Sequence, residues 1–157
     1  MAVTSIAEVR RAVAARIAAL GGDWNEAEVP FDRFGEALVP DHIPDTKAQC
    51  AFAVGVPATP EITDRQNTTG AWVKTTLLVR FLSRARAAAA GTVASGDDAL
   101  DLEHDVIRTL CVRSTEWPGA LGFALVLDRR SQACRPPFDW FMHEITFEAQ
   151  HRLALHA

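Results

Sequence analysis

The densest cluster of chemically active side chains in the sequence is acidic and falls within one predicted helix. Its members are Asp97, Asp98, Asp101, Glu103, His104 and Asp105. Asp97, Asp101 and Asp105 share one helical face, and carboxylates placed in this way could hold a hard cation for a metal-dependent enzyme. Acidic residues also favour the positive dipole end of a helix, and those further on form a solvated side. The pattern favours this structural interpretation, with an acidic surface for a partner subunit or a metal site as alternatives.

Two histidines, His143 and His151, lie in a segment that alternates as a β-strand does. They share its apolar face but stand too far apart to bind one ion together. His143 and Glu144 do not form a helical zinc motif, because the alternation is that of a strand and no second histidine follows four residues on. We therefore expect both histidines to be partly buried and hydrogen-bonded.

The sequence offers no recognisable nucleophile or phosphate-binding motif. Cys50, Cys111 and Cys134 are odd in number and widely spaced, which matches neither a disulfide framework nor a zinc site, so we expect reduced, buried thiols. A Gly-x-Ser-x-Gly elbow and a glycine-rich phosphate loop are both absent from the sequence. The residues therefore predict no catalytic site and no cofactor.

Charge and composition narrow the classes of protein further. The formal charge is -4, and the arginines are scattered except at Arg84 with Arg86 and Arg129 with Arg130, so sequence-independent binding of nucleic acid is not expected. The Arg84 and Arg86 pair could contact nucleic acid or an acidic subunit, but has few flanking aromatics and is more typical of a solvated strand end.

The length and apolar content fit one folded domain. The chain has 157 residues, of which 48% are hydrophobic and 23% charged, as in an ordinary globular protein with a single core. Charged residues interrupt the first 20 positions, and no stretch reaches the roughly 18 apolar residues of a membrane helix, so we expect a cytoplasmic location and no membrane partner.

The first half of the chain predicts one helix and two strands. Ser5 followed by Glu8 forms a possible capping box, and a helix with an apolar stripe should run from there to Gly21 and Gly22. An irregular segment over 23–47 leads to a strand over 49–56. The polar, turn-rich stretch 57–70 should project as a loop before a long, half-buried strand over 72–83.

The second half predicts a helix and two further strands. Ser95 or Asp97 can cap the helix, whose apolar stripe runs from Ala99 to Leu110. A strand over 121–127 follows, and 129–137 should be its exit loop. The predicted fold class is therefore α+β, a mostly antiparallel sheet with two helices packed on it in the order α-β-β-α-β-β, as one domain over 1–157.

The final segment, 138–155, keeps a two-sided strand pattern over an unusual length. Fully extended at about 3.4 Å per residue, this segment would span roughly 60 Å. A folded domain of this size has a radius of gyration of roughly 15 Å. We expect either a bulge that bends it or an extension that leaves the domain and pairs with another subunit.

The order of these elements resembles the tail terminator proteins of tailed bacteriophages. The likeness spans nearly the whole chain, through element order and strand character rather than a fixed motif. The segments that carry it are VRRAVAARIAALGG, QCAFAVGV, WVKTTLLVRFL, ALDLEHDVIRTL, ALVLDRR and WFMHEITFEAQHRLAL. The chain departs from this likeness in its proline-rich segment 29–44.

This resemblance implies a homohexameric ring, assembled in the host cytoplasm, at the head-proximal end of the virion tail. Such a ring stops growth of the tail tube protein and joins the head-tail connector, without a cofactor or a reaction. We expect subunit or partner contacts at Thr59, Glu61, Asp64, Arg65, Asn67, Arg84, Arg86, Asp97, Asp98 and Asp101. The alternatives are a head completion, connector or other minor tail subunit, and a small-molecule-binding or metal-dependent enzyme using the acidic helix 97–105.

Overall fold

A computed structural model of the chain describes residues 5–21, 24–26, 51–57, 61–67, 70–84, 96–117, 124–135 and 140–154. The elements follow in the order α1, β1, β2, β3, β4, α3, η2, β5 and β6. This is an α+β fold, and it contains the two helices and the four strands that the sequence predicts in their expected order.

Helix α1 (Ile6–Ala18) begins where its capping signal predicts. The backbone N–H of Ser5 donates to Glu8 Oε2 at 2.6 Å, and the backbone N–H of Glu8 donates to Ser5 Oγ at 3.1 Å. Both bonds satisfy N–H groups that have no partner within the first turn of a helix. The apolar stripe of α1 is buried at Val9, Val13 and Ile17. The sequence prediction for this helix is confirmed.

The strands form a six-stranded sheet in the order β1-β2-β4-β6-β5, with β3 also paired to β4. The strands are β1 (Asn25–Glu26), β2 (Ala51–Gly55), β3 (Glu61–Asn67), β4 (Gly70–Arg84), β5 (Ala124–Arg135) and β6 (Trp140–Ala154). Every pairing is antiparallel except that of β1 with β2. Along one edge of β4, β3 pairs with its first residues and β2 with its later ones.

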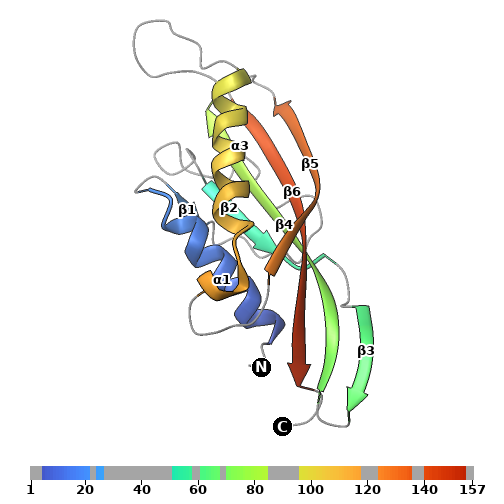
Figure 1. The fold of residues 1–157 in the computed structure, drawn as a ribbon. Helices are drawn as coiled ribbons and strands as arrows, with labels where there is room; N and C mark the ends of the chain where they lie inside the picture. The colour runs from blue at the N-terminus through green and yellow to red at the C-terminus, as the bar shows by residue number, and fades with distance from the viewer. Residues whose placement is uncertain are drawn as a thin grey trace, which may run out of the picture.

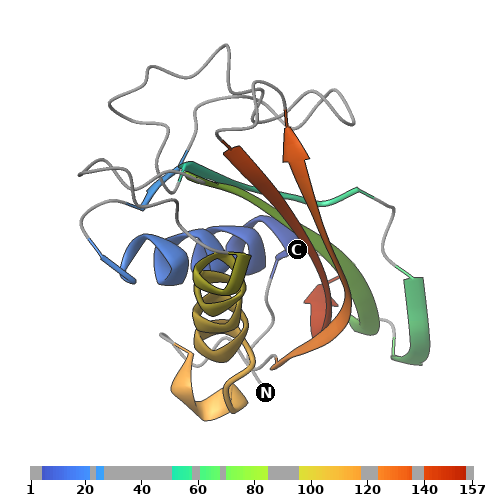
Figure 2. The same ribbon diagram turned by 90° about the horizontal axis from the view of Figure 1, so that it is seen from above.

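Helices α1 and α3 (Gly96–Leu110) cross each other on one face of the sheet, as Figures 1 and 2 show. Between this helical layer and the sheet lies the core. It is formed by Val9, Val13, Ala14, Ile17, Phe52, Val54, Leu77, Val79, Phe81, Val106, Leu110, Trp117, Leu125, Ile145, Phe147 and Ala149. Trp117 follows a short 3-10 helix, η2 (Ser114–Glu116). Burial of these apolar side chains is the main force that holds the helices on the sheet.

Two predicted loops contain strands. The segment 57–70 holds β3, which pairs with β4 through two register shifts, and the predicted exit loop 129–137 is largely the second half of β5. In both cases a polar sequence is extended because it pairs with a neighbouring strand, since strand formation depends more on pairing context than on intrinsic propensity. A bulge between Leu127 and Arg129 marks the change from apolar to polar sequence in β5.

The long final strand stays within the domain. All fifteen residues of β6, from Trp140 to Ala154, pair with β4, and this ladder has no register shift. The expectation that part of the strand leaves the domain is therefore wrong. The physical reason is that β4 is equally long, so the two strands satisfy each other's backbone groups from end to end. The bulge lies in β5 and not in the ladder between β4 and β6.

Candidate interaction surfaces and a buried polar cluster

The predicted contact residues of the acidic helix lie in the first two turns of α3. Asp97 and Asp98 belong to its first turn, and Asp101 is exposed. Asp105 is also exposed and lies 3.8 Å from Arg108, one turn further on. Within the part of the chain that the structure describes, no group of three or more His, Cys, Asp or Glu side chains is placed to hold a metal ion.

The predicted contact residues of the polar segment lie on an edge strand. Glu61, Asp64, Arg65 and Asn67 all belong to β3, where Glu61 is paired with Lys74 and Asn67 with Gly70. This strand lies at the end of the sheet that extends beyond the helices, away from the first turns of α3 (Figure 1). The structure therefore separates the two predicted sets of contact residues.

Of the arginine pair, the structure describes Arg84 only. Arg84 is the last residue of β4 and is paired with Trp140 of β6. Arg86 and Thr59 lie outside the described residues.

One member of the acidic cluster points inward. Glu103 is 1% exposed, so the expectation that the acidic cluster of α3 forms a solvated side is wrong for this residue. Arg130 of β5 donates to both carboxylate oxygens, from Nε to Oε1 and from Nη2 to Oε2, at 2.6 Å each. The two parallel bonds compensate the desolvation of the carboxylate. This Glu103 contact raises the pKa of Arg130.

A serine and a histidine continue this cluster into the sheet. The hydroxyl of Ser83 lies 2.8 Å from His143 Nε2, and His143 Nδ1 lies 3.6 Å from Glu103 Oε2. Phe81 stacks on the imidazole with ring centroids 4.1 Å apart. Burial lowers the pKa of His143, against the opposing influence of Glu103. The imidazole is therefore neutral at pH 7.

Ser83, His143 and Glu103 are the residue types of a hydrolase triad, and the sequence reasoning did not find them as a set. Their exposed fractions are 2%, 0% and 1%, so a substrate cannot reach the hydroxyl in this conformation. Both carboxylate oxygens of Glu103 accept hydrogen bonds from Arg130. The distance of 3.6 Å between Glu103 Oε2 and His143 Nδ1 is longer than a hydrogen bond. The geometry supports a structural cluster that joins α3 to β4, β5 and β6.

A second hydroxyl and imidazole pair lies further along the same two strands. Thr75 Oγ1 lies 2.8 Å from His151 Nε2, and both residues are fully buried. In each pair the histidine stands two residues beyond the direct partner of the hydroxyl residue in the ladder between β4 and β6. The prediction of hydrogen-bonded histidines is confirmed, although both are buried completely rather than partly.

The opposite face of the sheet carries ion pairs beside buried apolar residues such as Leu82 and Met142. Arg80 and Glu144 are directly opposed in β4 and β6 and form an ion pair of 2.7 Å, and Lys74 pairs with Glu148 at 3.0 Å. Pairs of this kind on a partly exposed surface add little stability. They do present alternating charge to any partner that approaches this face.

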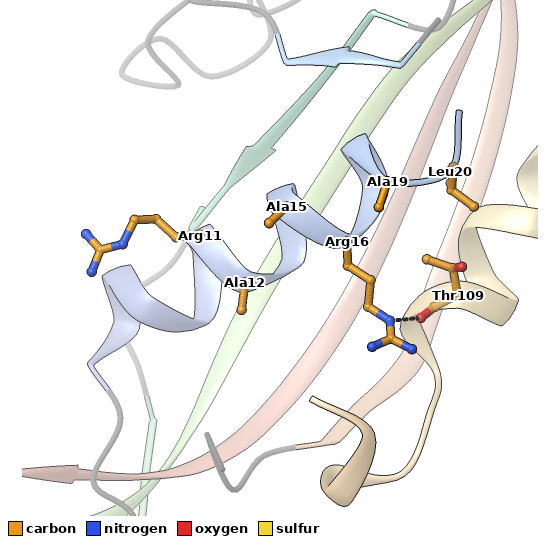
Figure 3. Close-up of a pocket in the computed structure, with 7 residues that line it drawn as sticks. All are labelled: Arg11, Ala12, Ala15, Arg16, Ala19, Leu20 and Thr109. Carbon is orange, nitrogen blue, oxygen red and sulfur yellow. Dashed lines mark hydrogen bonds between the residues drawn. The ribbon is translucent and has the colours of Figure 1, made fainter. Parts of the chain in front are cut away.

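A groove lies between α1 and α3, with a volume of about 600 Å³. Its lining, shown in Figure 3, consists of Arg11, Ala12, Ala15, Arg16, Ala19, Leu20 and Thr109, and we call it the α1 groove. Arg16 Nε donates to the backbone carbonyl of Thr109 at 2.6 Å and Nη1 to that of Glu116 at 2.9 Å. The guanidinium also lies 5.0 Å from the Trp117 ring centroid. These contacts hold the Arg16 side chain in place at one wall of the α1 groove.

The only cysteine whose side chain the structure describes, Cys111, is exposed, which corrects the expectation of a buried thiol at this position. Partial desolvation raises its pKa, against a hydrogen bond from the backbone of Leu127. The helices in the described ranges include none that is long and apolar enough to cross a membrane.

Comparison with known proteins finds solved structures of similar fold and does not assign the chain to a family. No protein-family model matches the chain, and no curated protein matches it. Among solved structures, 24 chains are similar. One belongs to the structure titled "Virion of native gene transfer agent (GTA) particle", with a TM-score of 0.53 and 18% identity over 92% of this chain and 94% of that chain. At this level of identity the likeness is one of fold, and it extends over nearly the whole length of both chains.

Proposed function

We propose that this chain is a structural protein of a phage-like virion, where it ends the growth of the tail tube. In this role it forms a ring at the head-proximal end of the tail and joins the tail to the head connector. The observation that carries the proposal is the shared fold with a chain of a gene transfer agent virion, which covers 92% of this chain and 94% of that one. Such coverage on both sides means that the whole domain, and not an isolated motif, is alike.

The position within the particle is inferred from the order of the elements. Helix α1, strands β2 and β4, helix α3 and strands β5 and β6 follow one another as in the resemblance to tail terminator proteins. The long ladder between β4 and β6 gives a stiff base from which an edge strand can project. A structural subunit of this kind acts through its surfaces, and we propose that it needs no cofactor and catalyses no reaction.

We propose that β3 is one of the surfaces that contact other subunits. It is an edge strand, and edge strands offer unpaired backbone groups to a neighbouring chain. Its residues Glu61, Asp64, Arg65 and Asn67 supply both signs of charge and one amide group for specificity. Together with Thr59 they form one proposed contact region.

The start of α3, with Asp97, Asp98 and Asp101, forms a second proposed region at the other end of the sheet. We also propose contacts of Arg84, the last residue of β4, and of Arg86 with an acidic partner. Two regions at opposite ends suit a subunit that bridges a tail tube and a head connector.

The proposal is tested by assembly. In native mass spectrometry, a terminator should form a particle of six times the 17.1 kDa of one chain, either alone or on tubes made from the tail tube protein of the same particle. Added during tube polymerisation, it should end growth, which electron microscopy detects as a ring at one end of each tube and a narrower length distribution.

The other outcomes separate the alternatives. A chain that stays monomeric with tube protein and leaves tube length unchanged is not a terminator. A ring that binds the connector protein but not the tube identifies a head completion subunit instead. A monomer that binds a divalent ion tightly, as measured by calorimetry, would support the alternative of a metal-dependent enzyme.

A further inference from the structure

We infer that the buried cluster of Ser83, Glu103, Arg130 and His143 is a proton-dependent clamp, in which a protonated His143 binds Glu103 and so ties strand β6 to helix α3. In the neutral form this tie is missing, and Arg130 is the hydrogen-bond donor that the described residues offer to the carboxylate. The clamp is a property of the fold and does not depend on the proposed role in assembly. Its two states differ in how firmly α3 is attached to the sheet.

The clamp begins with an unsatisfied nitrogen. His143 is fully buried, and its Nδ1 has no hydrogen-bond partner among the residues that the structure describes. This atom lies 3.6 Å from Glu103 Oε2, beyond hydrogen-bond distance. A ring nitrogen that faces a carboxylate is favoured when it carries a hydrogen, because its lone pair would be repelled. We therefore assign the proton of the neutral imidazole to Nδ1.

Ser83 suits both charge states of the imidazole. Its Oγ lies 2.8 Å from His143 Nε2, whereas Glu103 lies beside the other ring nitrogen. A hydroxyl is both a donor and an acceptor, and it rotates to suit its neighbour. Beside the neutral ring it donates to Nε2. Once Nε2 has taken up a proton from solvent, the hydroxyl turns and accepts from it, so the added proton has a partner within the core.

Glu103 is the group that stabilises a buried imidazolium. Among the described residues, the charged groups that face His143 are Glu103 on α3 and Arg130 on β5. Strand β4 contributes the uncharged Ser83 and Phe81, whose ring stacks on the imidazole. Protonation strengthens the attraction of Nδ1–H to Oε2, because both partners are then charged and shielded from water. A shift of about 0.8 Å would bring them to the usual length of a charge-assisted hydrogen bond.

Arg130 can share Oε2 of Glu103 or release it to His143. It donates from Nη2 to this oxygen at 2.6 Å, and its side chain is 44% exposed. A guanidinium that loses one bond here turns to water, whereas a buried imidazolium has no such alternative. A carboxylate oxygen also has room for two hydrogen bonds. The protonated form thus adds His143 to the partners of Glu103, while Nε of Arg130 keeps its bond to Oε1.

NMR of the imidazole tests the clamp, with the full chain titrated from pH 7.5 to 5. Burial lowers the pKa of His143, so the folded chain should take up this proton at a midpoint below 6.5. In the acid form, the Nδ1–H should show the downfield shift and slow exchange of a strong hydrogen bond. E103Q keeps the shape of the side chain and removes its charge, so it should abolish that signal and lower the midpoint by about 1 pH unit. The matched control D105N, an exposed carboxylate on the same helix, should change neither.

R130M provides an independent variant, because it leaves the carboxylate and removes the competing cation. The midpoint of His143 should then rise by about 1 pH unit, whereas R129M, which removes an exposed charge from the same strand, should not move it. If E103Q does not fold, R130M decides, and a midpoint equal to that of the wild type would overturn the inference.

Two results in the wild-type chain would overturn the inference without any variant. If the backbone amide signals of the folded state disappear as His143 takes up its proton, Glu103 does not stabilise the imidazolium and the core opens instead. If the chain stays folded but the Nδ1–H of the acid form shows no hydrogen bond, protonation forms no tie between β6 and α3. A downfield Nδ1–H that persists in E103Q would equally exclude Glu103 as its acceptor.

Discussion

Arg130 on the edge strand β5 holds Glu103 on helix α3 through two parallel hydrogen bonds of 2.6 Å. The carboxylate is buried, whereas the guanidinium side chain is 44% exposed. The pair therefore closes the cluster of Ser83, His143 and Glu103 from the side of the solvent. It also joins helix α3 to the edge strand of the sheet.

Replacement of Arg130 by methionine should destabilise the fold substantially. The buried Glu103 would lose both hydrogen bonds from Arg130, and an uncompensated buried carboxylate should lower the free energy of unfolding by about 3 kcal/mol. Urea denaturation measures this. The neighbouring exposed residue provides a control, because R129M should change stability by less than about 0.5 kcal/mol. A double variant E103M/R130M that is no more stable than R130M would contradict the assignment.

The pH dependence of stability should reveal His143. Its pKa in the folded protein is depressed below the ordinary 6.5 by burial. The unfolded chain therefore binds the proton more readily once the pH falls below about 6.5, and stability should decline from there by at most about 1.4 kcal/mol per pH unit. Thermal unfolding between pH 7.5 and 5, in steps, should show this slope, and H143Q should reduce it. An unchanged slope in H143Q would contradict the assignment.

The capping box of α1 makes a smaller and local contribution. Replacement of Ser5 by alanine removes the acceptor of the Glu8 N–H and should cost about 1 kcal/mol of stability. The hydrogen bonds from Ser5 hold the pKa of Glu8 below its ordinary value, so loss of the hydroxyl should raise that pKa part of the way back. Carboxyl chemical shifts in an NMR titration would report the change. S5D, which keeps an acceptor at the cap, should retain most of the stability.

The edge strand β3 provides a test of partner binding that is separate from folding. Alanine at Glu61, Asp64, Arg65 and Asn67 together removes four of the six polar side chains of the strand while leaving its backbone pairing to β4 possible. We expect weaker association with tail tube or connector protein in co-sedimentation, with little change in the melting temperature. D105N, at an exposed position of α3 outside the proposed contact regions, makes the same net change of charge. Equal loss of binding in both variants would show that charge alone, rather than β3, governs the association.

The sequence predicts those elements that are specified by local signals. The position of helix α1 could be predicted because Ser5, Glu8 and the apolar stripe are close together in the chain. The long strand β4 could be predicted because alternation extends over its whole length. Strand β3 could not, since EITDRQN carries no apolar period and becomes extended only through pairing with β4.

The buried cluster was missed for a related reason. Glu103 was grouped with its acidic neighbours, although its helical phase aligns it with Ala99, Val106 and Leu110 on the apolar side of α3. This helical phase is the feature of the sequence from which the burial of Glu103 could be predicted. Its partner Arg130 lies 27 positions away on a strand that was expected to be a loop, so no local pattern could pair them.

The ladder between β4 and β6 also constrains how the chain folds during its synthesis. Its pairs join Arg84 to Trp140 and Gly70 to Ala154, and β6 lies between β4 and β5 in the sheet. The ribosome must therefore produce β6 before the middle of the sheet can close, and contacts between such distant positions form slowly. Until then, β4 and β5 remain without their common neighbour. A truncated translation product that lacks β6 would leave β4 and β5 unpaired along the edges that β6 joins, and open strand edges of this kind promote aggregation.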